Sequence, residues 1–176
     1  MIRMVLATVC VALAVPAGGC SGASEPQRES TAGQPAEAAQ RALEAIPGVA
    51  SALITVERFV SGLTTHSQVA TEVTLEGGAA IPRPERLIDH LVAVSWSVNE
   101  TQPDTGVALT IHADPQIAVG PVAEQNGWPQ VSYLSQTDQD ATRSYALFPA
   151  SAVTARLGPW PGRPEPPPEG LIIAAT

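Results

Sequence analysis

Residues 68–76 read QVATEVTLE, and all the large apolar side chains of this stretch stand at odd-numbered positions. Val69, Val73 and Leu75 therefore fall on one side of an extended chain, while Glu72 falls on the other. This spacing predicts a β-strand that buries one face and wets the other, as strands of antiparallel sheets commonly do. We therefore expect a sheet that is covered on one face.

The segments on either side of this strand extend the pattern. Residues 36–46 and 84–98 carry apolar side chains at helical spacing, whereas residues 50–60 and 106–112 have the alternation of strands. The order helix, strand, strand, helix, strand predicts an α+β fold, a two-layer sandwich with the helices on one face of a mainly antiparallel sheet. The later elements are expected as a short helix at 120–126, strands at 131–135 and 144–148 across a polar turn at 136–141, and a last helix at 151–157.

Two of these segments also predict which side chains are buried. On the strand at 50–60, the residues expected to share one face are Ala52, Ile54, Val56 and Val60. On the helix at 84–98, Leu87, Ile88 and Leu91 belong to the apolar stripe. The side chains expected to point to solvent on that helix are Arg86, Asp89 and His90.

The stretch from residue 39 to residue 98, with its helix-Pro-Gly-Val-strand turn at 46–49, resembles the inner portion of a ferredoxin-like α/β sandwich. Heavy-metal-associated domains share that outline and carry a C-x-x-C pair before their first helix. This chain has only polar and small residues there, so the resemblance implies the fold without the metal function.

The excess of acidic over basic residues limits the kinds of partner that the chain is expected to bind. All nine basic residues are arginine, against 17 acidic residues, and the formal net charge is −8. The sequence contains no run of basic residues. Nucleic acids and anionic surfaces are met by Lys and Arg clusters, so we expect no nucleic-acid partner.

The first 19 residues have the order of a secretory signal peptide. Arg3 precedes an apolar run over residues 4–15, Pro16 breaks it, and the small residues 17–19 lead to Cys20. The run is shorter than the roughly 20 apolar residues that a transmembrane helix needs. A leader that is cleaved is therefore expected, rather than a membrane span.

The stretch ending at Cys20 resembles the lipobox of bacterial lipoproteins, although Ala17 stands where that family more often has Leu or Val. The resemblance implies that the cysteine receives diacylglycerol and becomes the new N-terminus, on the extracytoplasmic face of the cell membrane. Two acyl chains give stable anchoring. The alternative is ordinary secretion with cleavage after Ala14 or Ala17, which leaves Cys20 as an unpaired thiol. Cys10 is lost with the leader in either case.

The mature chain is expected to have three parts. Residues 20–35 are the lipidated cysteine and a small, polar, flexible tether. Residues 36–158 form the globular domain. Residues 159–176 form a Pro-rich tail outside the packed core, extended and disordered in its Pro-rich part, whose end at 171–173 adds a strand at a sheet edge or docks in a groove.

The residue types that carry chemistry do not assemble into a recognised motif. His66, His90 and His112 lack the i, i+4 spacing of a zinc helix, so we expect solvent-facing side chains and no metal site. There is no G-x-S-x-G turn for an activated serine. Asp138 and Asp140 fit the expected polar turn, with a weak divalent-ion site as the alternative. No cofactor is expected.

Two tryptophans are the candidate binding surface. Trp128 follows Asn126-Gly127, and Trp160 lies between two prolines, so both are expected to be exposed. The resulting hypothesis is a non-enzymatic, lipid-anchored binding or accessory module of the cell envelope, whose partner is another envelope protein or a cell-wall component. The alternatives are an extracytoplasmic hydrolase with a fold-assembled site, a secreted domain without lipid, and a purely structural lipoprotein.

Overall fold

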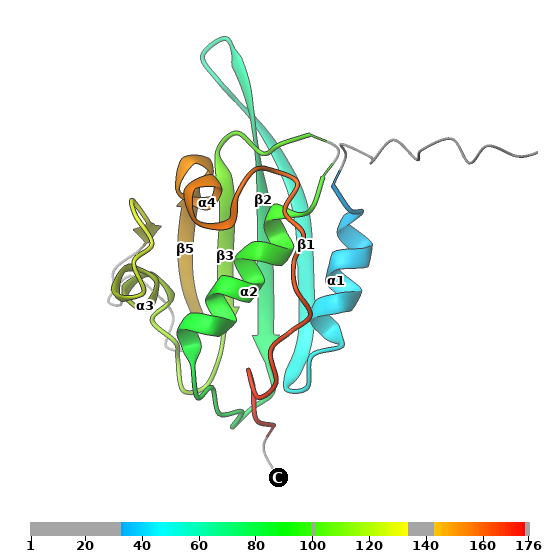
Figure 1. Cartoon of the computed structure of the whole chain (residues 1–176), viewed down its shortest axis with the longest axis vertical. Helices are drawn as coiled ribbons and strands as arrows, with labels where there is room; N and C mark the ends of the chain where they lie inside the picture. The colour runs from blue at the N-terminus through cyan, green and yellow to red at the C-terminus, as the bar shows by residue number, and fades with distance from the viewer. Residues whose placement is uncertain (1–32, 100, 134–142, 175–176) are drawn as a thin grey trace, which may run out of the picture.

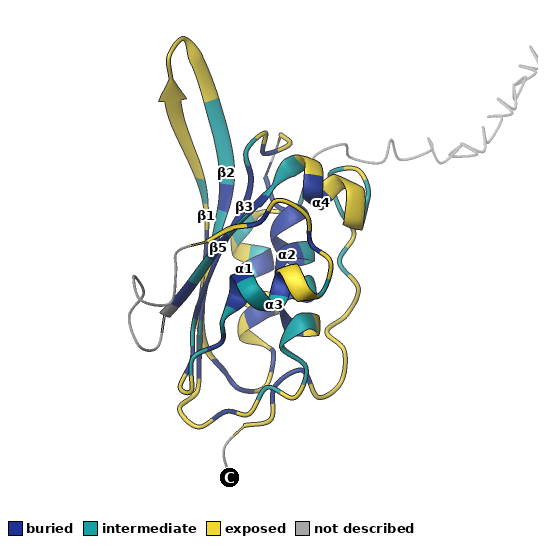
Figure 2. Cartoon of the chain, turned by 90° about the vertical axis from the view of Figure 1, so that its left-hand side faces the viewer, coloured by how far each residue is buried: buried dark blue, intermediate teal, exposed yellow. Residues whose placement is uncertain are grey.

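The computed structural model describes residues 33–99, 101–133 and 143–174. The elements are α1 (Ala36–Glu44), β1 (Val49–Ser61), β2 (Thr64–Leu75), α2 (Pro84–Trp96), β3 (Gly106–His112), α3 (Val119–Gln125), β4 (Ser132–Tyr133), β5 (Arg143–Pro149) and α4 (Ala150–Leu157). The strands form one sheet, and the helices lie against one of its faces (Figures 1 and 2). The α+β two-layer sandwich expected from the sequence is confirmed.

The strand order across the sheet is β1-β2-β3-β5-β4. β1 with β2, β3 with β5, and β4 with β5 are antiparallel, whereas β2 and β3 are parallel neighbours. A parallel pair needs a crossover connection, and α2 supplies it. The mainly antiparallel sheet is thus mixed at one place, between β2 and β3.

The core lies between the sheet and the helices. Val69 and Val73 of β2 have no exposed surface, as expected from their alternation, and they share the core with Leu87 and Leu91 of α2. One polar pair is buried there without a loss of hydrogen bonds: the hydroxyls of Thr71 and Ser95 are 2.7 Å apart, and Ser95 donates to the carbonyl of Leu91.

The C-terminal segment differs from its prediction. Residues 159–174, named here the strap, run over the α1 and α2 layer (Figure 1). Leu171 and Ile172 are 2% and 6% exposed and belong to the core. Ile173 exchanges two backbone hydrogen bonds with Ala80, outside the sheet. The expectation of a tail outside the core is wrong for this end, whose burial agrees with the alternative that residues 171–173 dock on the domain, because these apolar side chains complete the core that the helices leave open.

The strands β1 and β2 continue past the helix layer as a two-stranded projection (Figure 2). Residues 57–67 of this hairpin are named here the ribbon. Ala52 and Ile54 are buried as predicted, but Val60, expected on the same buried face, is 72% exposed. That prediction is wrong because the helices that cover the face end before the ribbon begins.

Candidate functional site

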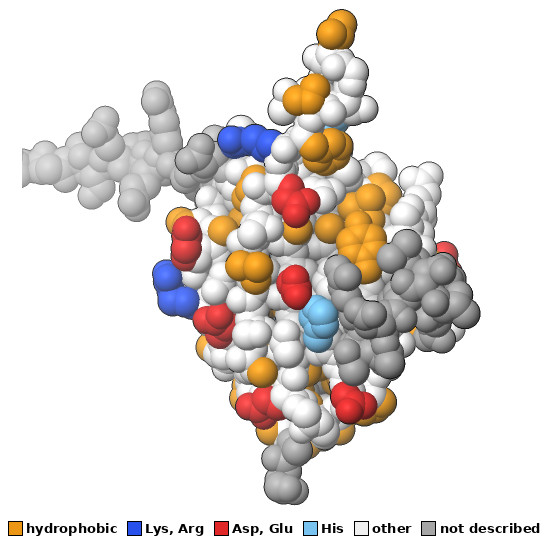
Figure 3. Space-filling view, turned by 180° about the vertical axis from the view of Figure 1, so that it is seen from behind, with side chains coloured by type: hydrophobic (Ala, Val, Ile, Leu, Met, Phe, Trp, Pro, Cys, Tyr) orange, Lys and Arg blue, Asp and Glu red, His pale blue; other side chains and the backbone are white. Residues whose placement is uncertain are grey.

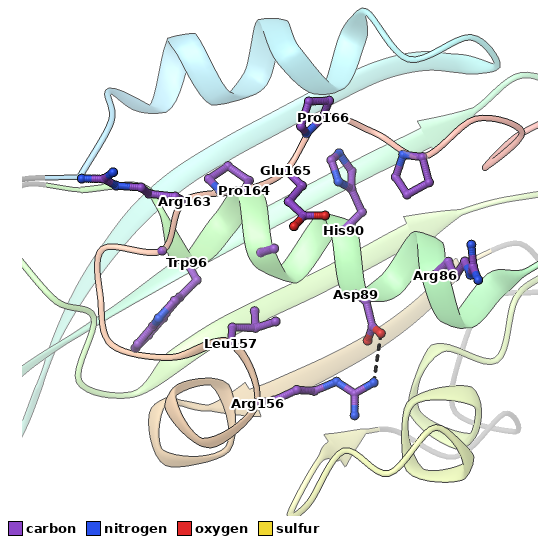
Figure 4. Close-up of a pocket in the computed structure, with 13 residues that line it drawn as sticks. Arg86, Asp89, His90, Trp96, Arg156, Leu157, Arg163, Pro164, Glu165 and Pro166 are labelled. Carbon is purple, nitrogen blue, oxygen red and sulfur yellow. Dashed lines mark hydrogen bonds and ion pairs between the residues drawn. The ribbon is translucent and has the colours of Figure 1, made fainter.

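A groove of about 450 Å³ lies on the helix side of the molecule, between α2, α4 and the strap (Figure 4). It is named here the strap groove. The α2 side chains that line it are Arg86, Asp89, His90, Ala93 and Trp96. These positions recur three and four residues apart, so they share the helix face that is turned away from the Leu87 and Leu91 stripe. Arg156 and Leu157 of α4 line the facing side.

Asp89 organises one side of the groove. Its carboxylate accepts a hydrogen bond of 2.7 Å from the indole N–H of Trp128 and pairs with Arg156 at 2.9 Å. The amide of Asn126 also donates to both carboxylate oxygens. Arg156 in turn lies over the Trp128 ring, with 4.8 Å between the guanidinium carbon and the ring centroid. These contacts tie α2 to α4 and to the segment after α3.

His90 is the buried ionisable group of the groove. Its side chain lies between α2 and the strap, close to Pro166 (Figure 4), and the residue is 9% exposed. Burial disfavours the charged imidazolium and lowers the pKa of His90 below 6.5. The expectation that it faces solvent is wrong, because the helical pattern of α2 contains no information about the strap that covers this face.

The groove combines apolar surface with an excess of positive charge. Three arginines line it, against the two carboxylates of Asp89 and Glu165, which leaves one net positive charge in a chain of net charge −8. Ala93, Trp96 and Leu157, together with strap prolines, supply the apolar part of the lining. Such a lining suits a ligand with an apolar body and an anionic group.

The ionisable groups of the described lining are carboxylates, arginines and one histidine. Among the described residues that line the groove, none is Ser, Thr, Cys, Tyr or Lys. Asp89, the carboxylate next to His90 in sequence, makes its polar contacts with Asn126, Trp128 and Arg156. His90 fits the hydrolase alternative, which calls for a buried ionisable group with a shifted pKa.

The candidate site residues from the sequence lie elsewhere. Cys20 is outside the described residues. Trp128 is 3% exposed, so its predicted exposure is wrong: its N–H is held by Asp89 and its ring packs edge-on against Phe148, with 4.9 Å between centroids. Trp160 is half-buried and donates to the carbonyl of Val98. Neither tryptophan lines the groove, but Trp128 supports its wall through Asp89.

Sequence reasoning missed the strap groove, although a signal for it was present. Arg86, Asp89 and His90 stand at i, i+3 and i+4, so three ionisable side chains share one face of a helix. By itself this spacing predicts a solvated face. Arg163 and Glu165, the charges of the strap, lie in the Pro-rich segment that predicts a disordered tail, so no local pattern connects the two halves of the lining.

The three histidines do not converge. His66 pairs with Asp104 at 2.6 Å, and His112 pairs with Glu72 at 2.8 Å, away from the groove. The backbone N–H of Ser67 and the His66 ring lower the pKa of Asp104. Within the described parts of the chain, no three His, Cys, Asp or Glu side chains are placed to hold a metal ion. Asp138 and Asp140, the alternative ion site, lie outside the described residues.

Comparison with known proteins finds no match for this chain among protein-family models, curated proteins or solved structures. None of the helices in the described residues has both the length and the apolar character that crossing a bilayer requires.

Proposed function

We propose that this chain is a non-enzymatic binding module, held on the extracytoplasmic face of the cell membrane by lipid on Cys20, and that its ligand lies in the strap groove. The observation that carries the binding role is the groove itself, an open cavity of about 450 Å³ with an apolar lining and an excess of arginine. The order of residues 3–20 supports the anchor.

The lining indicates the chemistry of the ligand. Arg86 and Arg163 line the groove together with Arg156, so a carboxylate or another anionic group is favoured at the groove. Trp96 and Leu157 offer apolar surface for the rest of the ligand. A cell-wall component or a segment of another envelope protein that combines an acidic group with an apolar part fits this description.

The anchor is tested by the substitution Cys20→Ser followed by membrane fractionation. We expect the variant to leave the membrane fraction, because the thioether that holds the acyl chains is no longer formed. Cys10→Ser is the matched control, since it removes a thiol from the leader and leaves the attachment residue in place. Unchanged membrane retention of the Cys20→Ser protein would overturn the proposed anchor.

The groove is tested by photo-crosslinking in living cells. The photoreactive residue p-benzoylphenylalanine is placed at Leu157, which lines the groove, or at Thr154, which is exposed on the same helix outside it. We expect a discrete adduct at Leu157 that is absent at Thr154 and is lost when Arg86→Glu reverses the charge of the groove. Equal adducts at both positions, or an adduct indifferent to Arg86→Glu, would contradict binding in the groove.

One observation favours a second candidate function, an extracytoplasmic hydrolase. A neutral imidazole such as that of His90 can accept a proton from water and act as a general base. In that case, the ligand captured at Leu157 is cleaved by the wild-type protein and remains intact with the His90→Gln variant. The binding proposal expects the ligand to be recovered unchanged from both proteins.

A further inference from the structure

The tip of the ribbon exposes large apolar side chains on a narrow projection. Phe59 is 42% exposed, Val60 72% and Leu63 fully exposed, at 106%. The ribbon extends beyond the edge of the helix layer (Figure 2), and Figure 3 shows apolar side chains spaced along this projection and acidic ones over the body below. Single exposed apolar side chains are ordinary, but Phe59 and Val60 point to opposite faces of β1 and Leu63 lies in the turn, so this hairpin end is apolar on both faces.

The ribbon and the beginning of α1 lie at the same end of the molecule (Figure 1). The first described residue, Gly33, donates its N–H to the carbonyl of Asn99, just after the end of α2. At that same end of the sheet, Thr105 donates to the carbonyl of Ser67 at the base of the ribbon. A tether of this composition has a mean reach of about 20 Å. An anchor on Cys20 would therefore hold the ribbon close to the bilayer.

The charge of the ribbon differs from that of the rest of the chain. The ribbon contains Glu57 and Arg58, whose formal charges cancel, and His66, which pairs with Asp104 at 2.6 Å, whereas the chain as a whole has a net charge of −8. An acidic body is repelled by anionic lipid headgroups, and a ribbon whose formal charges cancel is not. This end is thus the part of the domain best suited to approach a membrane surface.

We infer that the ribbon tip inserts into the interfacial layer of the membrane that holds the lipid anchor, so that Phe59, Val60 and Leu63 are in contact with lipid. The inference rests on the proposed anchoring and deepens it. Because the anchor makes insertion an intramolecular step, a weak affinity of the tip is sufficient. For each apolar side chain that is transferred fully out of water, the equilibrium constant for insertion rises about tenfold or more.

The depth of insertion is limited by the backbone. A two-stranded ribbon has two open edges, whose N–H and C=O groups cannot lose water in the hydrocarbon core. The hydroxyls of Ser61, Thr64 and Thr65 add further polar groups near the tip. The tip therefore inserts only to a shallow depth, at the level of the headgroups and the upper acyl chains.

The experiment uses the full lipidated chain with a fluorophore at the tip. When Cys20 is acylated, it has no free thiol, so Leu63→Cys gives one labelling site for an environment-sensitive dye. Leu53→Cys is the matched control, because Leu53 lies on β1, the strand that leads to the tip, and is 51% exposed within the body of the sheet. Both proteins are reconstituted in phosphatidylcholine vesicles with or without nitroxide-labelled lipids.

We expect the dye at position 63 to be quenched severalfold by shallow nitroxides and less by deep ones, and the dye at 53 to be unaffected. Equal, weak quenching at 63 and 53 in an acylated chain would overturn the inference and leave the anchor standing. A dye at 63 that is shielded from water without nitroxide quenching would also overturn it, because the tip would then be covered by protein.

The lipid anchor on Cys20 and the insertion of the ribbon tip can be tested separately. If mass analysis shows no acylation, the anchor is wrong, and the unlipidated Cys20→Ser chain with the dye at 63 is mixed with the same vesicles. Lipid-dependent quenching at 63 would then still support an inserting tip, now on a secreted domain. Its absence would overturn the inference together with the anchor.

Discussion

Ile54 and Val60 lie on the same face of β1, yet Ile54 is 5% exposed and Val60 is 72% exposed. The apolar alternation through Ala52, Ile54 and Val56 is interrupted at Arg58, and Val60 resumes it. The difference is the helix layer, which covers the sheet around Ile54 and ends before the ribbon (Figure 2). Alternation therefore sets which face a side chain takes, and a second layer sets whether it is buried. The covered body supplies stability, and the ribbon is left free for contact with a surface.

The largest effect on stability is expected when a side chain is truncated in the half of β1 that the helices cover. Ile54→Ala removes a side chain buried in the core and lowers the free energy of unfolding by about 2–5 kcal/mol. Urea unfolding followed by circular dichroism measures the loss. A loss of unfolding free energy from Ile54→Ala that is no larger than the loss from Val60→Ala would contradict the difference between the two halves of β1.

The next largest effect concerns the strap. Gly48 has a φ of +87°, and a Cβ there would overlap the side chain of Ile172. Gly48→Ala is therefore expected to lower the free energy of unfolding by about 2–4 kcal/mol, through backbone strain and the displacement of Ile172. Gly77→Ala is the matched control, because a Cβ at Gly77 meets no atom within 4 Å. Equal effects of the two substitutions would show that the strap does not lie on Gly48.

A smaller effect is expected at the wall of the strap groove. Asp89→Asn removes the ion pair with Arg156 and keeps one oxygen that can accept from Trp128. Because the paired side chains are 28% and 32% exposed, the expected loss is about 1 kcal/mol and shrinks in high salt. Glu85→Gln is the matched control, because it removes the same charge from the same helix as Asp89→Asn does. An equal loss in the control, with the same salt dependence, would contradict the role of the ion pair.

His90 predicts a pH effect whose sign follows from its burial. Burial lowers its pKa from 6.5, so below that pH the unfolded chain takes up a proton before the folded chain does. Stability is therefore expected to fall as the pH drops from about 6.5 toward the lower pKa of the folded state, and His90→Gln removes this part of the fall. Unfolding curves between pH 7.5 and 5 (roughly the range that histidine governs) measure it. Identical pH profiles for the wild type and the variant would contradict a buried, neutral His90.

The smallest effect on stability is expected at the ribbon. Val60→Ala and Leu63→Ser replace side chains that are 72% and fully exposed, so each changes the free energy of unfolding by no more than about 0.5 kcal/mol. The same substitutions are expected to weaken the contact of the tip with lipid. A large loss of stability from Leu63→Ser would mean that the tip packs against the body, and the contrast between the two halves would disappear.

The successes and failures of the sequence predictions have one physical origin. The alternation at 68–76 and the helical spacing at 84–98 are local, and they correctly indicated the strands, the helices and the buried Val69 and Leu87. The errors at Val60, His90 and Trp128 concern what lies over a face, which depends on segments distant in the sequence. Ile172 packs against Gly48, and Asp89 holds Trp128. No local pattern contains those contacts.

Intact-mass analysis of the protein isolated from bacterial membranes examines the attachment on which the proposed function depends. We predict a mature chain that begins at Cys20 and carries the added mass of a diacylglyceryl group. A chain that begins after Ala14 or Ala17, with no added mass on Cys20, would contradict the account and leave a secreted domain.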